Sequence, residues 1–268
     1  MRSKSKPLKN RPLLHFETYK NTGKEWILFI HGAGGSTRTW KRQIDSFKKD
    51  FQLLLIDLPG HGQNANKEAH LSEYSFSSIS NEIWKIVDHL KISKVHLLGV
   101  SLGAIFCLQM RAIRPHCVKS IAMPGAIVRL NMKLKALASF SLSLAKIIGY
   151  RNLYNMSAYI MMPRENHKKS RDVFVKESKV LTTEEFRKWT ALYYNLNTTL
   201  TSLFNDSSAI PHLLVMGSQD HLFLPPAKDY THYHNNADLI VIDKCGHVVS
   251  IEKAEYFNSI YLNFLKSV

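Results

Sequence analysis

The sequence predicts an α/β protein with a mostly parallel sheet, helices on both faces of that sheet and one inserted helical cap. Two observations lead to this fold class. Short apolar runs alternate with segments of helical periodicity, and a single long helical stretch interrupts the alternation. The 268 residues are 45% hydrophobic and 21% charged. This composition is typical of a globular protein and excludes a disordered, collagen-like or fibrous chain.

Six short segments are apolar without alternation, as expected for strands that are buried on both faces. They are residues 26–30, 51–56, 95–98, 118–123, 212–216 and 239–242. Four segments between them repeat apolar residues at helical spacing, and these are residues 37–48, 77–90, 102–114 and 251–264. This alternation predicts parallel strands that are covered by helices on both sides.

The alternation stops once, between residues 128 and 205, where the pattern is helical and rich in Lys and Arg. We interpret this segment as a cap inserted between the sixth and seventh strands, over the carboxyl edge of the sheet. The predicted organisation is a core of residues 12–127 and 206–268, a cap of residues 128–205 and a basic tail of residues 1–11. Residues 136–145 of the cap carry no charge. They fit a helix over the pocket better than an interfacial amphipathic helix.

The net charge of +15 is unevenly distributed. Residues 1–24 have 7 basic and 1 acidic side chains, and residues 128–205 have 13 and 5, whereas residues 206–268 have 4 and 7. A nucleic-acid partner is not expected, because no recognition motif is present and the charge belongs to a tail and a cap. The positive charge of these two segments is compatible with weak peripheral contact with anionic surfaces or with steering of an anionic substrate. Lys168, Lys169 and Arg171 are expected to form an exposed part of this surface.

The three cysteines show no CxxC spacing, so a disulfide framework is not expected and a reducing, cytoplasmic location is the natural interpretation. The basic first residues are not followed by the apolar run of a signal peptide. No stretch of 18 apolar residues is present that would predict a transmembrane segment.

Residues 99–103 read Gly-Val-Ser-Leu-Gly, between the strand that ends at residue 98 and the helix that begins at residue 102. This is the G-x-S-x-G pattern in its strand–turn–helix context, which predicts a nucleophilic Ser101. The tight turn lifts the hydroxyl above the strand ends. Gly99 and Gly103 remove side chains that would collide there.

Residues 31–36 read His-Gly-Ala-Gly-Gly-Ser and directly follow the strand at residues 26–30. A phosphate-binding loop would need a Lys-Ser/Thr pair, which is missing. We therefore expect an oxyanion hole, formed by the backbone amides of Ala33 and Leu102. His31 is expected to hold the loop rather than to act in catalysis.

A nucleophilic serine needs a base and an acid that orients the base. His247 follows the last strand and Asp220 follows the strand at residues 212–216, so both are expected at the same sheet edge as Ser101. Asp243 is a competing acid, but its place at a strand end favours capping or exposure. His221, His232 and His234 are expected at the surface. No metal-binding motif occurs, and neither a metal nor an organic cofactor is expected.

Five motifs in this order resemble the α/β-hydrolase fold family, in particular its capped serine hydrolases of the esterase and lipase type. They are His31-Gly32 and residues 57–62, 99–103, 217–220 and 246–247. The resemblance extends from about Leu13 to Val268. It implies that the loop at residues 57–62 shapes the site, with a structural His61. Serine at position 101 separates the chain from relatives with an aspartate nucleophile, such as epoxide hydrolases and haloalkane dehalogenases.

The predicted function is therefore that of a serine hydrolase, a carboxylic ester hydrolase that cleaves a small-molecule ester or thioester through an acyl-enzyme. The acyl group is expected to be largely apolar, because the cap is rich in Met and aromatic residues that suit a pocket above Ser101. The same triad also serves carbon–carbon bond hydrolases, lactonases, perhydrolases and acyltransferases, and the sequence leaves these open. A non-catalytic ligand-binding role is disfavoured by the complete triad.

Overall fold

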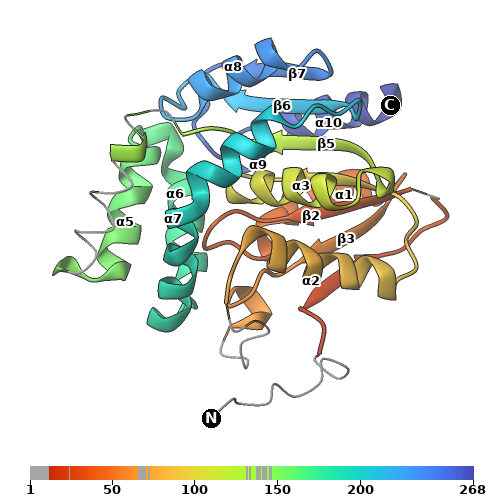
Figure 1. The fold of residues 1–268 in the computed structure, drawn as a ribbon. Helices are drawn as coiled ribbons and strands as arrows, with labels where there is room; N and C mark the ends of the chain where they lie inside the picture. The colour runs from red at the N-terminus through yellow and green to blue at the C-terminus, as the bar shows by residue number, and fades with distance from the viewer. Residues whose placement is uncertain are drawn as a thin grey trace.

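A central sheet organises the computed structural model, which describes residues 12–268 except 24, 66–70, 72, 131, 133, 137–139, 141–143 and 145–146. Within these residues the sheet has seven strands in the order β1-β3-β2-β4-β5-β6-β7 (Figure 1). The strands are β1 (Phe16–Tyr19), β2 (Trp26–Ile30), β3 (Gln52–Ile56), β4 (Val95–Gly99), β5 (Val118–Pro124), β6 (His212–Gly217) and β7 (Ala237–Ile242). Every neighbouring pair is parallel except β1 and β3.

Strand β1 is an element that the sequence pattern did not predict. It pairs antiparallel with β3, with Phe16 opposite Ile56, and its residues are only half-buried. An edge strand of this kind has no continuous apolar run, and such a run was the signal used for the other six strands. Those six strands were predicted within a few residues of their observed ends.

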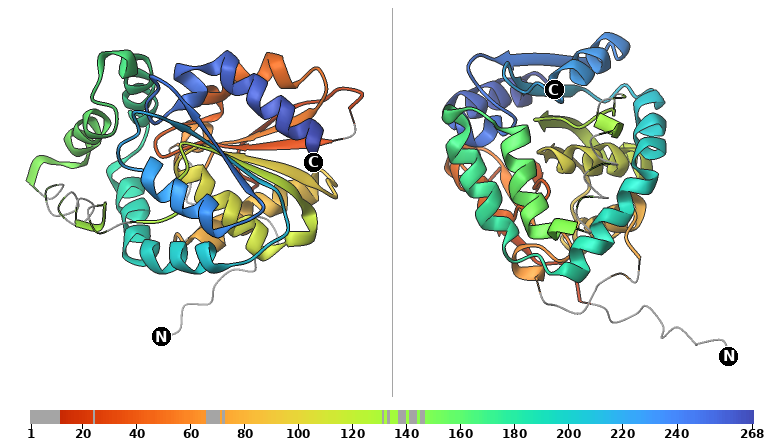
Figure 2. Two further views of the ribbon diagram at one scale, coloured as in Figure 1. Left: turned by 90° about the horizontal axis from the view of Figure 1, so that it is seen from above. Right: turned by 90° about the vertical axis from the view of Figure 1, so that its left-hand side faces the viewer.

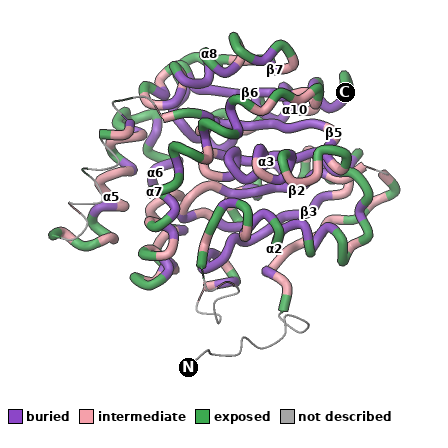
Figure 3. Tube along the Cα trace, viewed as in Figure 1, coloured by how far each residue is buried: buried purple, intermediate pink, exposed green. Residues whose placement is uncertain are grey.

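Helices cover both faces of the sheet, as Figure 2 shows most clearly in its left-hand view. One face packs against α2 (Phe76–His89), α3 (Leu102–Ile113) and α8 (Leu224–Tyr233), and the other against α1 (Lys41–Phe47), α9 (Val249–Glu252) and α10 (Ala254–Ser267). The inner strands are buried almost throughout (Figure 3). The predicted α/β fold class is confirmed.

Helices α5 (Tyr150–Met161), α6 (Lys168–Ser178) and α7 (Thr183–Asn205) lie between β5 and β6 in the chain. They extend beyond the carboxyl ends of the strands (Figure 1). This is the predicted helical insertion. In the described part of the chain its flanking strands are the fifth and sixth along the sequence, not the sixth and seventh. The exact limits of core and cap stay a prediction. Residues 1–11 and most of residues 136–145 lie outside the described residues.

Buried polar contacts fasten these helices to the core. Glu177 of α6 accepts a hydrogen bond of 2.6 Å from the Ser36 hydroxyl. The indole of Trp189 on α7 donates to the carbonyl of Pro59 at 3.1 Å. Because both contacts are buried, opening the cap would expose polar groups and apolar surface together.

Two expectations about surface side chains were wrong. Arg171 is buried, and its guanidinium donates at 2.6 Å to the carbonyls of Met162 and Arg164. His234 is also buried and donates from Nε2 to the carbonyl of Phe204 at 2.8 Å. Each side chain donates hydrogen bonds to backbone carbonyls in another segment of the chain. The distribution of charge along the sequence does not reveal such contacts.

Two buried strand histidines link folding to pH. Burial lowers the pKa of His96 on β4 to about 4 and that of His212 on β6 to about 3, from an ordinary value of 6.5. His96 is hydrogen-bonded to the Ser120 hydroxyl and His212 to the Tyr230 hydroxyl. Both imidazoles are therefore neutral in the folded protein at neutral pH.

We predict that the free energy of unfolding is largest above about pH 6.5 and decreases as the pH falls towards 4. In that range the unfolded chain binds protons that the folded chain excludes. Urea unfolding at several pH values measures this dependence. Replacement of the exposed His232 by Gln should leave the dependence unchanged. An unfolding free energy that is constant between about pH 7.5 and 5 would contradict the prediction.

Candidate active site

Ser101 occupies a strained turn where β4 ends and α3 begins. Its backbone has φ 56° and ψ −115°, a region that residues with a side chain rarely adopt. The turn is closely packed, because a Cβ atom on Gly103 would lie 2.2 Å from the carbonyl oxygen of Ile30. A Cβ atom on Gly99 would lie 2.3 Å from the carbonyl oxygen of Gly103. Glycine at both positions is therefore a steric requirement of the turn.

The structure brings Ser101, His247 and Asp220 together in one hydrogen-bonded chain. His247 Nε2 lies 2.9 Å from Ser101 Oγ, and His247 Nδ1 lies 2.7 Å from Asp220 Oδ2. A carboxylate only accepts hydrogen bonds, so in the neutral imidazole Nδ1 carries the ring proton and Nε2 accepts from the serine hydroxyl. His247 is 2% exposed and Asp220 is 1% exposed.

Packing holds the two partners of Ser101 in place. The other carboxylate oxygen of Asp220 accepts from the backbone amide of Phe223 at 3.1 Å. The ring of Phe223 lies 4.9 Å from the imidazole of His247. Asp243 is exposed and accepts a hydrogen bond from the Ser218 hydroxyl at 3.2 Å. Of the two candidate acids, Asp220 is the one that contacts His247.

The glycine-rich loop after β2 is held by two buried histidines. His31 Nε2 accepts from the amide of Leu58, and His61 Nε2 accepts from the amide of Gly34, each at 3.0 Å. Burial lowers the pKa of His31 to about 4 and that of His61 to about 3. Both rings are neutral acceptors at neutral pH, which fits the structural roles expected for them.

The amides proposed for the oxyanion hole belong to residues beside the nucleophile. Ala33 and Leu102 line the same cavity as Ser101. Within the described part of the chain, neither amide donates to a protein acceptor. Leu102 is also the first residue of α3, where free backbone amides favour negative charge.

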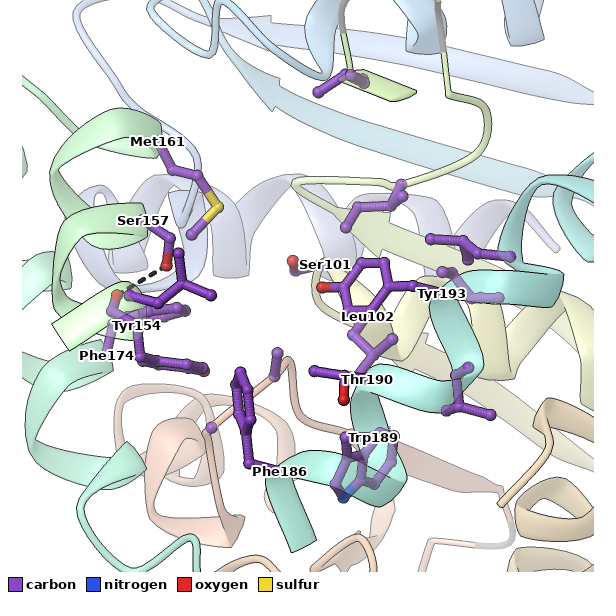
Figure 4. A pocket seen from close by; sticks show the side chains of 18 of the residues that line it. Ser101, Leu102, Tyr154, Ser157, Met161, Phe174, Phe186, Trp189, Thr190 and Tyr193 are labelled. Carbon is purple, nitrogen blue, oxygen red and sulfur yellow. Dashed lines mark hydrogen bonds between the residues drawn. The ribbon is translucent and has the colours of Figure 1, made fainter. Parts of the chain in front are cut away.

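A cavity of about 240 Å³ opens above Ser101 between core and cap. Cap residues form much of its wall, as Figure 4 shows, and its described lining residues include no Asp, Glu, Lys or Arg. Examples of the apolar lining are Leu134, Leu153, Met161, Phe174, Phe186 and Trp189. This pocket suits an apolar group.

A second cavity of about 40 Å³ lies beside the first. Both cavities are bordered by Ala33, Ser101 and Phe174. His247 borders the small cavity and is not among the described residues that line the large one. No sequence motif indicated this division, because it depends on how the cap packs on the core.

Two cap tyrosines also face the site and were not predicted individually. Figure 4 shows that the Tyr193 hydroxyl points into the pocket towards Ser101. The Tyr154 hydroxyl is buried next to Gly34 and has no hydrogen-bond partner among the described residues. Nothing in the sequence separates these two tyrosines from the other aromatic residues of the cap.

In the ranges that the structure covers, no three His, Cys, Asp or Glu side chains gather as a metal site. Among the described helices, none is long and apolar enough to cross a bilayer.

Comparisons with known proteins agree with this architecture. Residues 25–254 match the family described as alpha/beta hydrolase fold. A 2-hydroxy-6-oxononadienedioate/2-hydroxy-6-oxononatrienedioate hydrolase of Klebsiella pneumoniae subsp. pneumoniae is 27% identical over 267 residues, 91% of this chain and 88% of that protein. The structure of an esterase from Exiguobacterium antarcticum is similar with a TM-score of 0.80 at 15% identity, covering 94% of this chain and 95% of that chain.

Another relative is a longer protein. The dihydrolipoyllysine-residue acetyltransferase component of the acetoin cleaving system of Pseudomonas putida is 24% identical over 257 residues, 90% of this chain. The chain spans 63% of the length of that protein, which is less than two thirds.

We predict that Gly103→Ala destabilises the fold by about 1–3 kcal/mol, because the new methyl group would overlap the carbonyl of Ile30. Urea unfolding measures the loss. Gln109→Ala, at a half-buried position of the same helix, should change the unfolding free energy by less than about 0.5 kcal/mol. Equal stabilities of the two variants would refute the steric argument.

Proposed function

This chain belongs to the α/β-hydrolase fold family, and on that premise we propose that it is a serine hydrolase of carboxylic esters with a largely apolar, uncharged acyl group. The family and the expected enzyme class, a hydrolase of this fold, are confirmed by the match over residues 25–254. The observation that carries the proposal is the hydrogen-bonded chain from Asp220 through His247 to Ser101, which lines an apolar pocket. Together these groups supply a nucleophile, a base and a binding site for an acyl chain.

In the first half of the proposed reaction, Ser101 Oγ attacks the ester carbonyl carbon while His247 Nε2 takes the hydroxyl proton. The carbonyl oxygen becomes an oxyanion, which the amides of Ala33 and Leu102 would stabilise. The bond from the carbonyl carbon to the alcohol oxygen then breaks, and the imidazolium returns its proton to that oxygen. The products of this half are a free alcohol and an acyl-enzyme.

In the second half, a water molecule attacks the acyl-enzyme and gives one proton to His247 Nε2. Collapse of the second tetrahedral intermediate breaks the bond to Ser101 Oγ, which regains its proton from the imidazolium. The overall change is one ester and one water to one acid and one alcohol. Asp220 fixes the ring tautomer and stabilises the imidazolium in both halves.

The absence of charged groups among the described lining residues supports an uncharged acyl group. A buried carboxylate without a cationic partner is strongly unfavourable. A substrate such as the dienedioate named for the Klebsiella relative would bring a second carboxylate with it. Carbon–carbon bond hydrolysis, lactone hydrolysis and acyl transfer use the same triad and remain alternatives. A non-catalytic binding role would not account for the hydrogen-bonded arrangement of Ser101, His247 and Asp220.

We also propose that the protein is cytoplasmic, that its partner is a small-molecule acyl substrate and that it makes weak contact with anionic surfaces. The basic surface of the cap is smaller than the sequence suggested. Arg171 is buried, and Lys168 pairs with Asp172 at 2.8 Å.

We predict that methyl esters are hydrolysed with a kcat/KM that increases from acetyl through butyryl to octanoyl, because longer chains bury more apolar surface. A methyl ester whose octanoyl-length chain ends in a carboxylate should react at least about tenfold more slowly. Titration of the released acid measures both rates. In Ser101→Ala, kcat should fall by about 10⁴–10⁶. Retained activity in this variant, or preference for the terminal carboxylate, would overturn the proposal.

We predict that Asp220→Asn lowers kcat by about 10²–10⁴ without unfolding the protein, because the imidazole loses the acceptor that sets its tautomer. Asp243→Asn should cost less than about tenfold, since Asp243 is exposed and bonded to Ser218. Steady-state kinetics with methyl octanoate compares the two variants. The reverse order of losses would make Asp243 the functional acid.

A further inference from the structure

The two cavities at Ser101 differ in size and in access to the base. The large cavity of about 240 Å³ is bordered by Ala33, Ser101 and Leu102. The small cavity of about 40 Å³ is bordered by Ala33, Ser101 and His247. Both therefore reach the nucleophile, and the imidazole belongs to the described lining of the small one.

We propose that the small cavity is the leaving-group site, which receives a small neutral alcohol in acylation and the hydrolytic water in deacylation. The large cavity then holds the acyl chain. This assignment rests on the proposed ester hydrolysis and narrows it to esters of alcohols the size of methanol or ethanol.

The assignment of the small cavity to the leaving group rests on the transfer of a proton from His247 Nε2 to the departing alcohol. The departing alcohol oxygen takes its proton from His247 Nε2, so it must come within about 2.6–3.2 Å of that atom. Nε2 already lies 2.9 Å from Ser101 Oγ. The alcohol oxygen thus has to leave on the side of Ser101 where the imidazole faces open space. That side is the small cavity.

The water of the second half-reaction obeys the same constraint. It must give its proton to His247 Nε2 and must approach the acyl carbon from the side that the alcohol has vacated. A volume of about 40 Å³ is sufficient for about one or two water molecules. One small chamber can therefore serve both steps in turn.

The walls of the two cavities differ in chemistry as well. Thr39, Ser170 and Glu177 contribute polar side chains to the small cavity. The Glu177 carboxylate accepts hydrogen bonds from Ser36 at 2.6 Å and from Arg38 at 3.1 Å. This carboxylate is already paired with Arg38, and the described lining of the small cavity includes no Lys or Arg. Such a wall suits water or a neutral alcohol and offers no cation to an anionic leaving group.

The limit on size comes from residues on both sides of the cap–core boundary. Val173 and Phe174 of α6 line the small cavity together with Val100 and Ile251 of the core. Phe174 is held by a stacked contact with Tyr154, with ring centroids 4.4 Å apart. A longer alcohol has to displace these apolar side chains.

The test varies the alcohol at a constant acyl group. With octanoate esters, kcat/KM is expected to fall at least about tenfold from methyl to n-butyl in the wild-type protein. Val173→Ala enlarges the small cavity and should raise the butyl-to-methyl ratio of kcat/KM at least about fivefold. Val173→Leu makes the cavity smaller and should lower that ratio.

A matched control lies on the neighbouring cap helix. Ile160 of α5 borders the large cavity and is not among the described residues of the small one. Ile160→Ala should change the preference for acyl length while leaving the butyl-to-methyl ratio within about twofold of wild type. This separates a loss of leaving-group selection from a general loosening of the cap.

Two kinds of result would overturn the assignment of the cavities, and a third would overturn the proposed function. Equal rates for methyl and butyl esters, or a preference for acetyl esters of long alcohols, would overturn the assignment of the cavities. A ratio that Val173→Ala and Val173→Leu leave unchanged would overturn it too. If no ester of any alcohol is hydrolysed, the proposed function itself fails.

Discussion

The strained backbone of Ser101 is the constraint on which the site depends. At φ 56° the residue can project its hydroxyl above the sheet only because Gly99 and Gly103 let β4, α3 and β2 approach closely. Because the strands are parallel, Asp220 and His247 lie at the same edge of the sheet as Ser101, at the carboxyl ends of the strands. Asp220 follows β6 and His247 follows β7, so the hydrogen-bonded chain results from strand direction together with one tight turn.

The helices between β5 and β6 shape the space around Ser101. They enclose a large apolar space above Ser101 and a small, partly polar space beside His247. Neutral histidines hold the loop that carries Ala33, so no fixed positive charge from His31 or His61 reaches the pocket at neutral pH. The core therefore supplies Ser101, Asp220 and His247, and α5, α6 and α7 supply much of the wall of the space beside them.

The sequence was sufficient for the features that depend on local patterns. Buried parallel strands have continuous apolar runs, and the turn around Ser101 needs glycines at fixed positions. Six strands, and the meeting of Ser101, Asp220 and His247 at one edge of the sheet, could therefore be predicted. Features that depend on tertiary packing could not be predicted from the sequence. The edge strand β1 lacks a buried run, and Arg171 and His234 are buried because distant carbonyls accept their hydrogen bonds. The division of the active-site space into two cavities likewise depends on side chains from separate helices.

The most direct test of the central claim is intact-mass analysis after reaction with a small fluorophosphonate, which phosphonylates a serine only where a base and an oxyanion site activate it. The account predicts one adduct per chain, located on Ser101 by peptide mapping. The reaction should be at least about a hundredfold slower in His247→Gln. A wild-type protein that stays unmodified, or that is labelled at another serine, would contradict the account.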